Sequence, residues 1–476
     1  MEEKKKQENP LVKKYKSSWE LIEEEEKKIV DLFGESYIDF ISYSKTERKA
    51  VEFSLKLAQS KGFQDINTKK TLKAGDKVYF INRAKNILLA VIGKEPLEKG
   101  FNLLAAHVDA PRLDLKPNPL YEDSGMALLK THYYGGIKKY QWAAIPLALY
   151  GVVINQKGEK IDINIGDDPN DPIFYISDLL IHLAKDQMKK SLDEGISGED
   201  LNVLCGSIPL VGKEDEKKPE NPIKENILNI LNQKYGITEE ELVGSEFEIV
   251  PAGLARYVGF DKSLIAGYGH DDRSCSFASL RAVLDLKEVP DRTSLVLLAD
   301  KEEIGSYGNT GLESDFLSYA VLELMDKKEN RADILSLKRV LKNSMAISAD
   351  VGAAVDPNYP GVEDKKNACY LSKGVILKKY TGSRGKSGAS DANAEFISMM
   401  RNLFTSNEIN WQTGELGKVD QGGGGTVAFL LAKMNMDVLD VGLPVLSMHA
   451  PTEVIAKIDL YMAYKAYRVF LEKAGC

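Results

Sequence analysis

The sequence predicts an α/β protein in which a mixed sheet flanked by helices is interrupted by a second, β-rich domain. In the first and last parts of the chain, short apolar runs alternate with amphipathic stretches, which is typical of strands covered by helices. Between residues 113 and 261, apolar and polar residues alternate as they do in β-hairpins. We therefore expect residues 1–112 and 262–476 to form one discontinuous domain and residues 113–261 to be inserted in it.

The size and charge of the chain narrow its class. Its 476 residues are enough for two or three domains, and 43% hydrophobic with 28% charged residues is typical of a globular protein. The net charge of -8 gives no overall attraction to nucleic acid or to anionic membranes. Residues 1–10 carry both charge signs and precede no long apolar run, so we expect a cytoplasmic protein without a signal peptide or membrane span. The four scattered cysteines predict free thiols.

Several elements can be placed along the chain. Ser44 and Glu47 have the spacing of a capping box, which predicts a helix that starts there and ends at Gly62. A hairpin is expected over 152–165, and a charged, proline-containing stretch covers 213–221. The strands expected in the discontinuous domain are 78–81, 87–92, 101–106, 294–299, 345–349 and 437–441.

Histidines and carboxylates recur where these predicted strands end. His107 follows one strand, Asp350 follows another, and His449 follows the apolar run 443–448. Each has an ordinary structural explanation when taken alone, such as a histidine satisfied by a neighbouring carboxylate. The chain has only 5 histidines, however, and two of them close strands in this way. The recurrence favours a shared metal site.

Two pairs of adjacent carboxylates fit the same pattern. Asp271 and Asp272 lie at a glycine-rich turn that opens a helix, where one of them is explained as a helix cap. Glu302 and Glu303 directly follow a predicted strand, at the sheet edge where ligands bind in α/β proteins. A charged loop without function is the alternative for the second pair.

Two histidines and three carboxylates suit a pair of zinc-like ions. Borderline cations accept imidazole nitrogen, and a shared carboxylate offsets their repulsion; manganese or cobalt would also fit. Two such ions, about 3.5–4 Å apart, activate water for amide hydrolysis. Glu302 is then expected to be the general base beside the ligand Glu303. Asp109 lies on the same side of its strand as His107 and can hold the imidazole ring.

Five dispersed motifs strengthen this interpretation. They are His107-Val-Asp109-Ala-Pro, Asp271-Asp272, Glu302-Glu303-x-Gly305-Ser306, Ser348-Ala-Asp350 and Ser447-Met-His449. In kind and in order they resemble the motifs of the aspartyl aminopeptidase and vacuolar aminopeptidase I family of dinuclear zinc aminopeptidases. The resemblance extends over nearly the whole chain, from about residue 9.

The resemblance implies a zinc-peptidase domain with an inserted dimerisation domain, and an enzyme that removes N-terminal residues from peptides. It implies that His107 and Asp350 bind one zinc and that Glu303 and His449 bind the other. Asp271 would bridge the two ions, with Asp272 as the alternative. Glu302 would be the catalytic base and Asp109 would orient His107. The resemblance further implies that dimers assemble into a tetrahedral dodecamer.

Departures from the family pattern concern the substrate. Residues 137–142 lack the family's Trp-x-x-Trp-Phe-Asp-Arg run, and Arg273-Ser-Cys275 stands where the aspartyl enzymes have a longer linker. Both departures speak against a preference for acidic N-terminal residues and resemble a bacterial branch of the family. Lys378 or Lys379 lies near the family's basic substrate-binding side chain, and solvated surface lysines are the equal alternative.

Other functions use similar features. A carboxypeptidase or deacylase needs the same ligands, and a non-catalytic oligomeric scaffold could keep the metals for stability, although it has no use for Glu302.

Residues 422–425 are all glycine but lack the Gly-Lys-Ser/Thr ending of a phosphate-binding loop, so we expect a tight turn near the substrate. His132 and His270 are each as readily surface histidines as groups that support the site.

Overall fold

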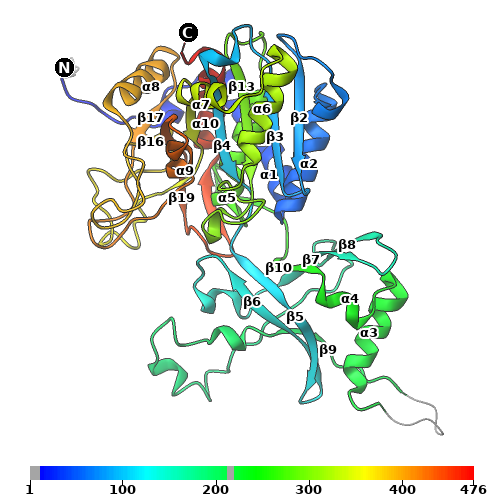
Figure 1. The fold of residues 1–476 in the computed structure, drawn as a ribbon. Coiled ribbons are helices and arrows are strands. Elements are labelled where there is room, and N and C mark those ends of the chain that lie inside the picture. Colours follow the sequence, from blue (N-terminus) through cyan, green and yellow to red (C-terminus); the bar gives the residue numbers. More distant parts are fainter. Residues whose placement is uncertain (1–10, 212–218, 476) are drawn as a thin grey trace, which may run out of the picture.

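The computed structural model describes residues 11–211 and 219–475 and has two lobes (Figure 1). The larger lobe contains a nine-stranded mixed sheet between two layers of helices, and the smaller lobe is built on a six-stranded sheet. Residues 1–10, most of the charged stretch 213–221 and Cys476 lie outside the described residues. Within them, Cys205, Cys275 and Cys369 are free thiols. None of the described helices is both long and apolar enough to span a membrane.

The nine-stranded sheet confirms the predicted α/β class. In spatial order its strands are β1 (Gln64–Asp65), β2 (Lys77–Asn82), β3 (Asn86–Val91), β13 (Thr293–Ala299), β4 (Phe101–His107), β14 (Met345–Ser348), β18 (Asp437–Gly442), β16 (Val375–Lys378) and β17 (Trp411–Thr413). The four adjacent strands β13, β4, β14 and β18 run parallel to one another. Their carboxyl ends therefore meet at one edge of the sheet, where α/β proteins bind ligands.

Two helical layers cover this sheet. One layer consists of α1 (Glu24–Tyr43), α2 (Glu47–Ser60), α5 (His270–Leu284), α8 (Ala394–Ser406) and α10 (Lys457–Lys473). The other consists of α6 (Phe316–Glu329), α7 (Ile334–Lys342) and α9 (Ala428–Lys433). Successive residues of β4 point into the two cores in turn, with Leu104 in the first and Leu103 in the second.

The start of α2 differs from the prediction. The helix is capped by Thr46, whose Oγ1 accepts the N–H of Lys49 at 3.3 Å, so the predicted cap at Ser44 is wrong. Ser44 instead follows the last residue of α1. The helix ends at Ser60, just before Gly62, whose φ of +86° is the left-handed conformation that glycine tolerates best.

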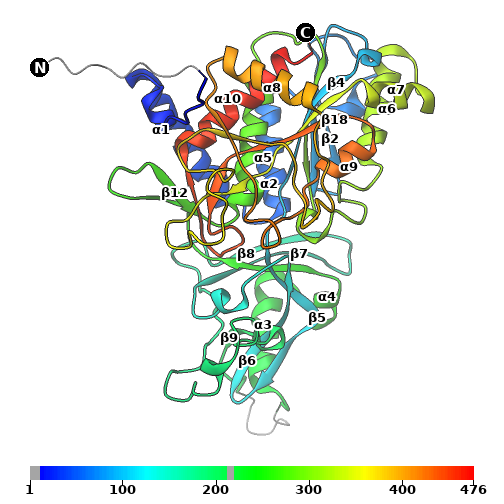
Figure 2. The same ribbon diagram turned by 90° about the vertical axis from the view of Figure 1, so that its left-hand side faces the viewer.

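The smaller lobe is built on an antiparallel sheet (Figure 2). It has its own hydrophobic core. Its strands are, in spatial order, β8 (Lys160–Ile165), β7 (Leu147–Ile154), β10 (Glu246–Pro251), β5 (Arg112–Asp123), β6 (Met126–Tyr134) and β9 (Val203–Gly206). Helices α3 (Pro222–Tyr235) and α4 (Glu239–Val243) pack against it. β7 and β8 form the hairpin predicted over 152–165.

A third sheet positions two further segments of the chain, the start of α5 and the residues that lead to His449. It consists of β11 (Arg256–Val258), β12 (Leu264–Gly267), β20 (Glu453–Ala456), β19 (Pro444–Leu446) and β15 (Gly352–Ala353). β12 leads into α5, and β19 leads to His449. His449 is therefore carried by a three-residue strand of this small sheet and not by a strand of the main sheet. Short 3-10 helices are η1 (Ser18–Glu20), η2 (Ile66–Thr68), η3 (Leu97–Lys99), η4 (Lys139–Trp142), η5 (Gln187–Lys189), η6 (Gly198–Asp200) and η7 (Glu302–Ile304).

Candidate metal centre

The five predicted metal ligands lie together at the carboxyl edge of the nine-stranded sheet. His107 is the last residue of β4, and Asp350 follows the neighbouring parallel strand β14 by two residues. Glu303 lies in η7, just after β13 on the other side of β4. Asp271 is the second residue of α5, and His449 reaches the cluster from the third sheet.

Short distances join the ligands into overlapping groups. His449 Nε2 lies 3.1 Å from Asp271 Oδ2 and 3.3 Å from Glu303 Oε1. His107 Nε2 lies 3.7 Å from Asp350 Oδ1. Two groups of potential metal ligands share Asp271, one with His107 and Asp350 and one with Glu303 and His449, and within each group the ligand atoms lie within 4.8 Å of one another.

Asp272 belongs to a third group. Its Oδ1 lies 3.7 Å from His107 Nδ1, and it could join His107 and Glu303 around an ion. It faces the ring nitrogen that points away from Asp350, so it lies on the far side of His107 from the first group.

Burial and mutual repulsion raise the pKa values of several carboxylates in this cluster. Burial, with the charges of Asp350 and Asp109 nearby, raises the pKa of Glu302 to about 8. Burial also raises the pKa of Asp272 to about 7, with help from Asp271. Burial acts in the opposite direction on His449, but Asp271 and Glu303 outweigh it and raise the pKa of His449 to about 11. The site therefore holds more negative charge than its own side chains compensate.

A divalent cation fits this donor set. The buried carboxylates of Asp271 and Glu303 lie 3.1 and 3.3 Å from the single nitrogen His449 Nε2, so their negative charge is only partly compensated within the cluster. Buried charges of this kind are normally paired or bound to metal. Imidazole nitrogens mixed with carboxylate oxygens are the ligands that zinc accepts.

Asp109 supports the turn that carries the glutamates. Its carboxylate accepts the main-chain N–H groups of Glu302 at 3.1 Å and of Glu303 at 3.2 Å. Its Oδ1 lies 3.6 Å from His107 Nδ1, which is longer than a hydrogen bond. The preceding Lys301 adopts a φ of +70°, so the chain turns sharply between the end of β13 and η7.

Glu453, the first residue of β20, also supports the cluster and is not predicted from the sequence. It is buried, and its Oε2 accepts the N–H of Asp271 at 2.9 Å. The only signal available was an acidic residue four positions after His449. For His270, which the sequence allows to be a surface histidine or a group that supports the site, the surface alternative is wrong. It is fully buried 2.7 Å from the hydroxyl of Tyr37, and burial lowers its pKa to about 3. His132 lies exposed on β6.

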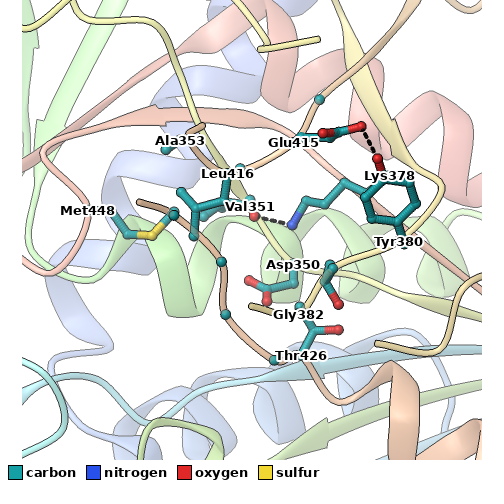
Figure 3. A pocket seen from close by; sticks show the side chains of 18 of the residues that line it. Asp350, Val351, Ala353, Lys378, Tyr380, Gly382, Glu415, Leu416, Thr426 and Met448 are labelled. Carbon is teal, nitrogen blue, oxygen red and sulfur yellow. Dashed lines mark hydrogen bonds between the residues drawn. The ribbon is translucent and has the colours of Figure 1, made fainter. Parts of the chain in front are cut away.

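A cavity of about 540 Å³ opens beside the cluster (Figure 3). Lys378, at the end of β16, is buried and its Nζ donates to the carbonyl oxygen of Val351, whereas Lys379 is 57% exposed. The surface alternative is therefore wrong for Lys378. The glycines 422–425 line the cavity, as do Asp271, Glu302, Glu303, Ile376, Leu416, Phe429, Met448 and His449.

Comparison with known proteins identifies the type of enzyme. Residues 40–471 match the family described as Aminopeptidase I zinc metalloprotease (M18). The chain belongs to the M18 family. The probable M18 family aminopeptidase 1 of Clostridium acetobutylicum is 50% identical over 467 residues, covering 97% of this chain and 99% of that one. The probable M18 family aminopeptidase 1 of Thermotoga maritima is 45% identical over 462 residues, covering 96% of this chain and 99% of the relative.

Solved structures agree with this assignment. The M18-family aminopeptidase structure from Thermotoga maritima has a TM-score of 0.92 at 44% identity and covers 97% of this chain and 100% of that one. Aminopeptidase I from Clostridium acetobutylicum has a TM-score of 0.89 at 47% identity, with 97% and 99% coverage. The M18 chain is thus a zinc aminopeptidase. Of the amide hydrolases that the sequence allows, the family selects the aminopeptidase over the carboxypeptidase and the deacylase.

Proposed function

We propose that this M18 aminopeptidase holds two zinc ions, one bound by His107 and Asp350 and the other by Glu303 and His449, with Asp271 bridging them. The observation that carries the proposal is that Asp271 belongs to both ligand groups. Asp272 faces the opposite nitrogen of His107, so it is less suited to the bridge. Manganese or cobalt would be accepted by the same donors.

Glu302 is the proposed general base. When bound, zinc ions act as Lewis acids on the scissile carbonyl and make water a better nucleophile at neutral pH. Glu302 lines the cavity next to the ligand Glu303. It takes the proton from the attacking water and passes it to the leaving amine. Its pKa of about 8 applies to the chain without metal, and nearby cations would lower it so that the carboxylate is ionised at neutral pH.

Asp109 acts through its neighbours. By accepting the N–H groups of Glu302 and Glu303, it holds the base and a ligand in one fixed turn. Its charge also lies near His107, which favours the orientation of that ring toward Asp350.

Residues 113–261 are the proposed dimerisation domain of a cytoplasmic tetrahedral dodecamer. Within them, one segment exposes many apolar side chains, as expected of a surface covered by another subunit: Ile173, Leu179, Leu180, Ile181, Leu183, Met188 and Leu192. The mApe1 structure from S. cerevisiae, which is 23% identical with a TM-score of 0.74 and covers 94% of this chain and 97% of its own, is a dodecamer.

Glu302→Gln, together with metal removal, tests the proposal. The variant should keep two zinc ions per subunit and the oligomeric state of the wild type, while kcat falls by about 10²–10⁴-fold. Chelation of the wild type should abolish release of N-terminal residues from aminoacyl amides, and zinc should restore it. A Glu302→Gln enzyme with unchanged kcat would remove Glu302 from the mechanism. A zinc content of one per subunit in a fully active enzyme would remove the second ion.

A further inference from the structure

The end of strand β6 in the smaller lobe contacts the metal centre directly. Residues 134–136, Tyr134-Gly135-Gly136, leave the six-stranded sheet and pass over the cluster. We refer to them as the 134–136 segment. Three separate contacts join this segment to groups that hold or support the metals.

The first contact is made by a side chain. The hydroxyl of Tyr134 donates to Asp109 Oδ2 at 2.8 Å. Asp109 is fully buried and its carboxylate also accepts the N–H groups of Glu302 and Glu303. Tyr134 is therefore hydrogen-bonded directly to the carboxylate that fixes the turn of Glu302 and Glu303.

The second contact is made by a main-chain carbonyl. His449 Nδ1 lies 2.8 Å from the carbonyl oxygen of Gly136, and since a carbonyl only accepts, Nδ1 carries the proton. The other nitrogen, Nε2, then faces Asp271 and Glu303. A carbonyl that accepts from one ring nitrogen fixes the tautomer and direction of a metal-binding histidine.

The third contact explains the glycine at position 135. A Cβ on Gly135 would lie 3.2 Å from Glu303 Oε2, and the φ of +73° at this position is strained for any other residue. A Cβ on Gly136 would lie 3.4 Å from His449 Nδ1, which is an ordinary van der Waals distance. A side chain at position 135 would therefore press on the proposed ligand Glu303, and Gly136 lies in contact with His449.

The segment is in turn anchored in the smaller lobe. The guanidinium of Arg112 lies 3.9 Å from the centre of the Tyr134 ring, opposite it in the β5–β6 pair. Arg112 is buried and forms ion pairs with Asp114 at 2.7 Å and with Glu248 at 3.3 Å. Its NH1 also lies 3.6 Å from Glu47 at the start of α2, so the same cluster reaches the larger lobe.

We propose that the 134–136 segment is a positioning element of the metal centre, which sets the orientation of His449 and of the Glu302–Glu303 turn from the smaller lobe. The centre is then complete only when this lobe is docked against the nine-stranded sheet. The proposal rests on the ligand assignment made above and adds to it residues that touch neither metal nor substrate.

Tyr134→Phe tests it, because the substitution removes one hydroxyl and keeps the ring under Arg112. Loss of a partner behind a metal ligand typically lowers metal affinity or activity about 10–100-fold. We expect the zinc affinity, measured by competition with a chromophoric chelator, to fall within that range, with kcat reduced and KM little changed. Tyr150→Phe is the matched control, since Tyr150 lies on β7 of the same sheet and donates to Asp167, which is neither a proposed ligand nor a hydrogen-bond partner of one. It should keep wild-type zinc affinity.

Gly135→Ala is the second variant and decides the question if Tyr134→Phe does not fold. It should also weaken zinc binding, because its methyl group would lie 3.2 Å from Glu303 Oε2 in a backbone conformation that strains any side chain. Zinc affinities of both folded variants within twofold of the wild type would overturn the proposal. A failure of the ligand assignment itself would be distinguishable, since the wild type would then bind less than two zinc ions or Glu302→Gln would stay active.

Discussion

The carboxylate of Glu453 accepts the main-chain N–H of His449, with 2.6 Å between the nitrogen and Oε1. Its other oxygen accepts the N–H of Asp271. One buried side chain thus fixes the backbone at two of the proposed ligands, which come from segments of the chain far apart in sequence. His449 itself adopts a φ of +64°, a conformation that this hydrogen bond helps to hold.

Glu453→Gln should therefore weaken zinc binding as well as the fold. Glutamine offers a single acceptor oxygen, and its amide N–H₂ would face the second main-chain N–H. An unsatisfied buried group of this kind costs about 1–3 kcal/mol. Asp459→Asn is the control, because Asp459 also accepts two main-chain N–H groups, from Ser372 and Gly374, at a distance from the ligands. Both variants should unfold at lower temperature, but only Glu453→Gln should lose zinc affinity in chelator competition. Equal zinc affinity in the two variants would contradict this role.

Removal of the metal should reverse the pH dependence of stability. Without metal, the pKa values of Asp272, about 7, and Glu302, about 8, exceed those of the unfolded chain. The folded protein then binds more protons than the unfolded one, so its stability falls as pH rises from about 4 to about 8. The raised pKa of His449 extends the loss to higher pH. Zinc needs ionised carboxylates and neutral imidazoles, so the loaded protein loses stability as pH falls.

Thermal unfolding with zinc and with chelator checks this at about pH 5.5 and about pH 8, which both lie in the range where stability without metal falls with pH. The difference between the two midpoints should widen at the higher pH. With chelator present, the thermal midpoint of Glu302→Gln should decrease less with pH than that of the wild type, because one titrating group is gone. A difference in midpoints that is the same at both pH values would show that these carboxylates do not carry the effect.

Sequence reasoning brings the proposed ligands together where a regular element carries them. His107 ends one of two neighbouring parallel strands and Asp350 follows the other by two residues, and short continuous apolar runs mark such strands in the sequence. Sequence reasoning fails where tertiary packing determines which residue a side chain contacts. Glu453 reaches Asp271 because β20 pairs with β12, and nothing local to either strand encodes that pairing. The contact of Gly136 with His449 depends likewise on how two lobes dock.

Lys378→Met should destabilise the protein strongly. The Lys378 ammonium donates to the Val351 carbonyl beside Asp350, as Figure 3 shows, and the charges of Asp350 and Asp440 keep its pKa high despite burial. Removing the ammonium leaves a buried acceptor unsatisfied, which costs about 1–3 kcal/mol, and leaves the nearby charges of Asp350 and Asp440 without a compensating cation. Lys379→Met is the matched control at an exposed site and should change stability by no more than about 0.5 kcal/mol. Thermal midpoints at one protein concentration compare the two, and similar values would show that Lys378 is not holding Asp350 in place.

Lys378 also affects which N-terminal residue the cavity can accept. Leu416, Met448 and other apolar side chains line the cavity, and the one buried ammonium is already compensated by the protein. Glu415 is likewise engaged, since it accepts the Tyr380 hydroxyl at 2.6 Å. Three further cations, Arg384, Lys386 and Lys418, line the cavity where they are exposed, and solvent screens their charges.

We therefore expect kcat/KM to be higher for apolar N-terminal residues such as leucine and methionine than for aspartate and glutamate. A panel of aminoacyl amides with one common leaving group would measure the ratio. Burying an acidic side chain without a free cation costs several kcal/mol, so the difference should reach at least about tenfold. A higher kcat/KM for the acidic amides would mean that Lys378 leaves Val351 and pairs with the substrate. In that case Lys378→Met, if folded, should abolish the acidic preference and leave turnover of the leucine amide comparatively intact.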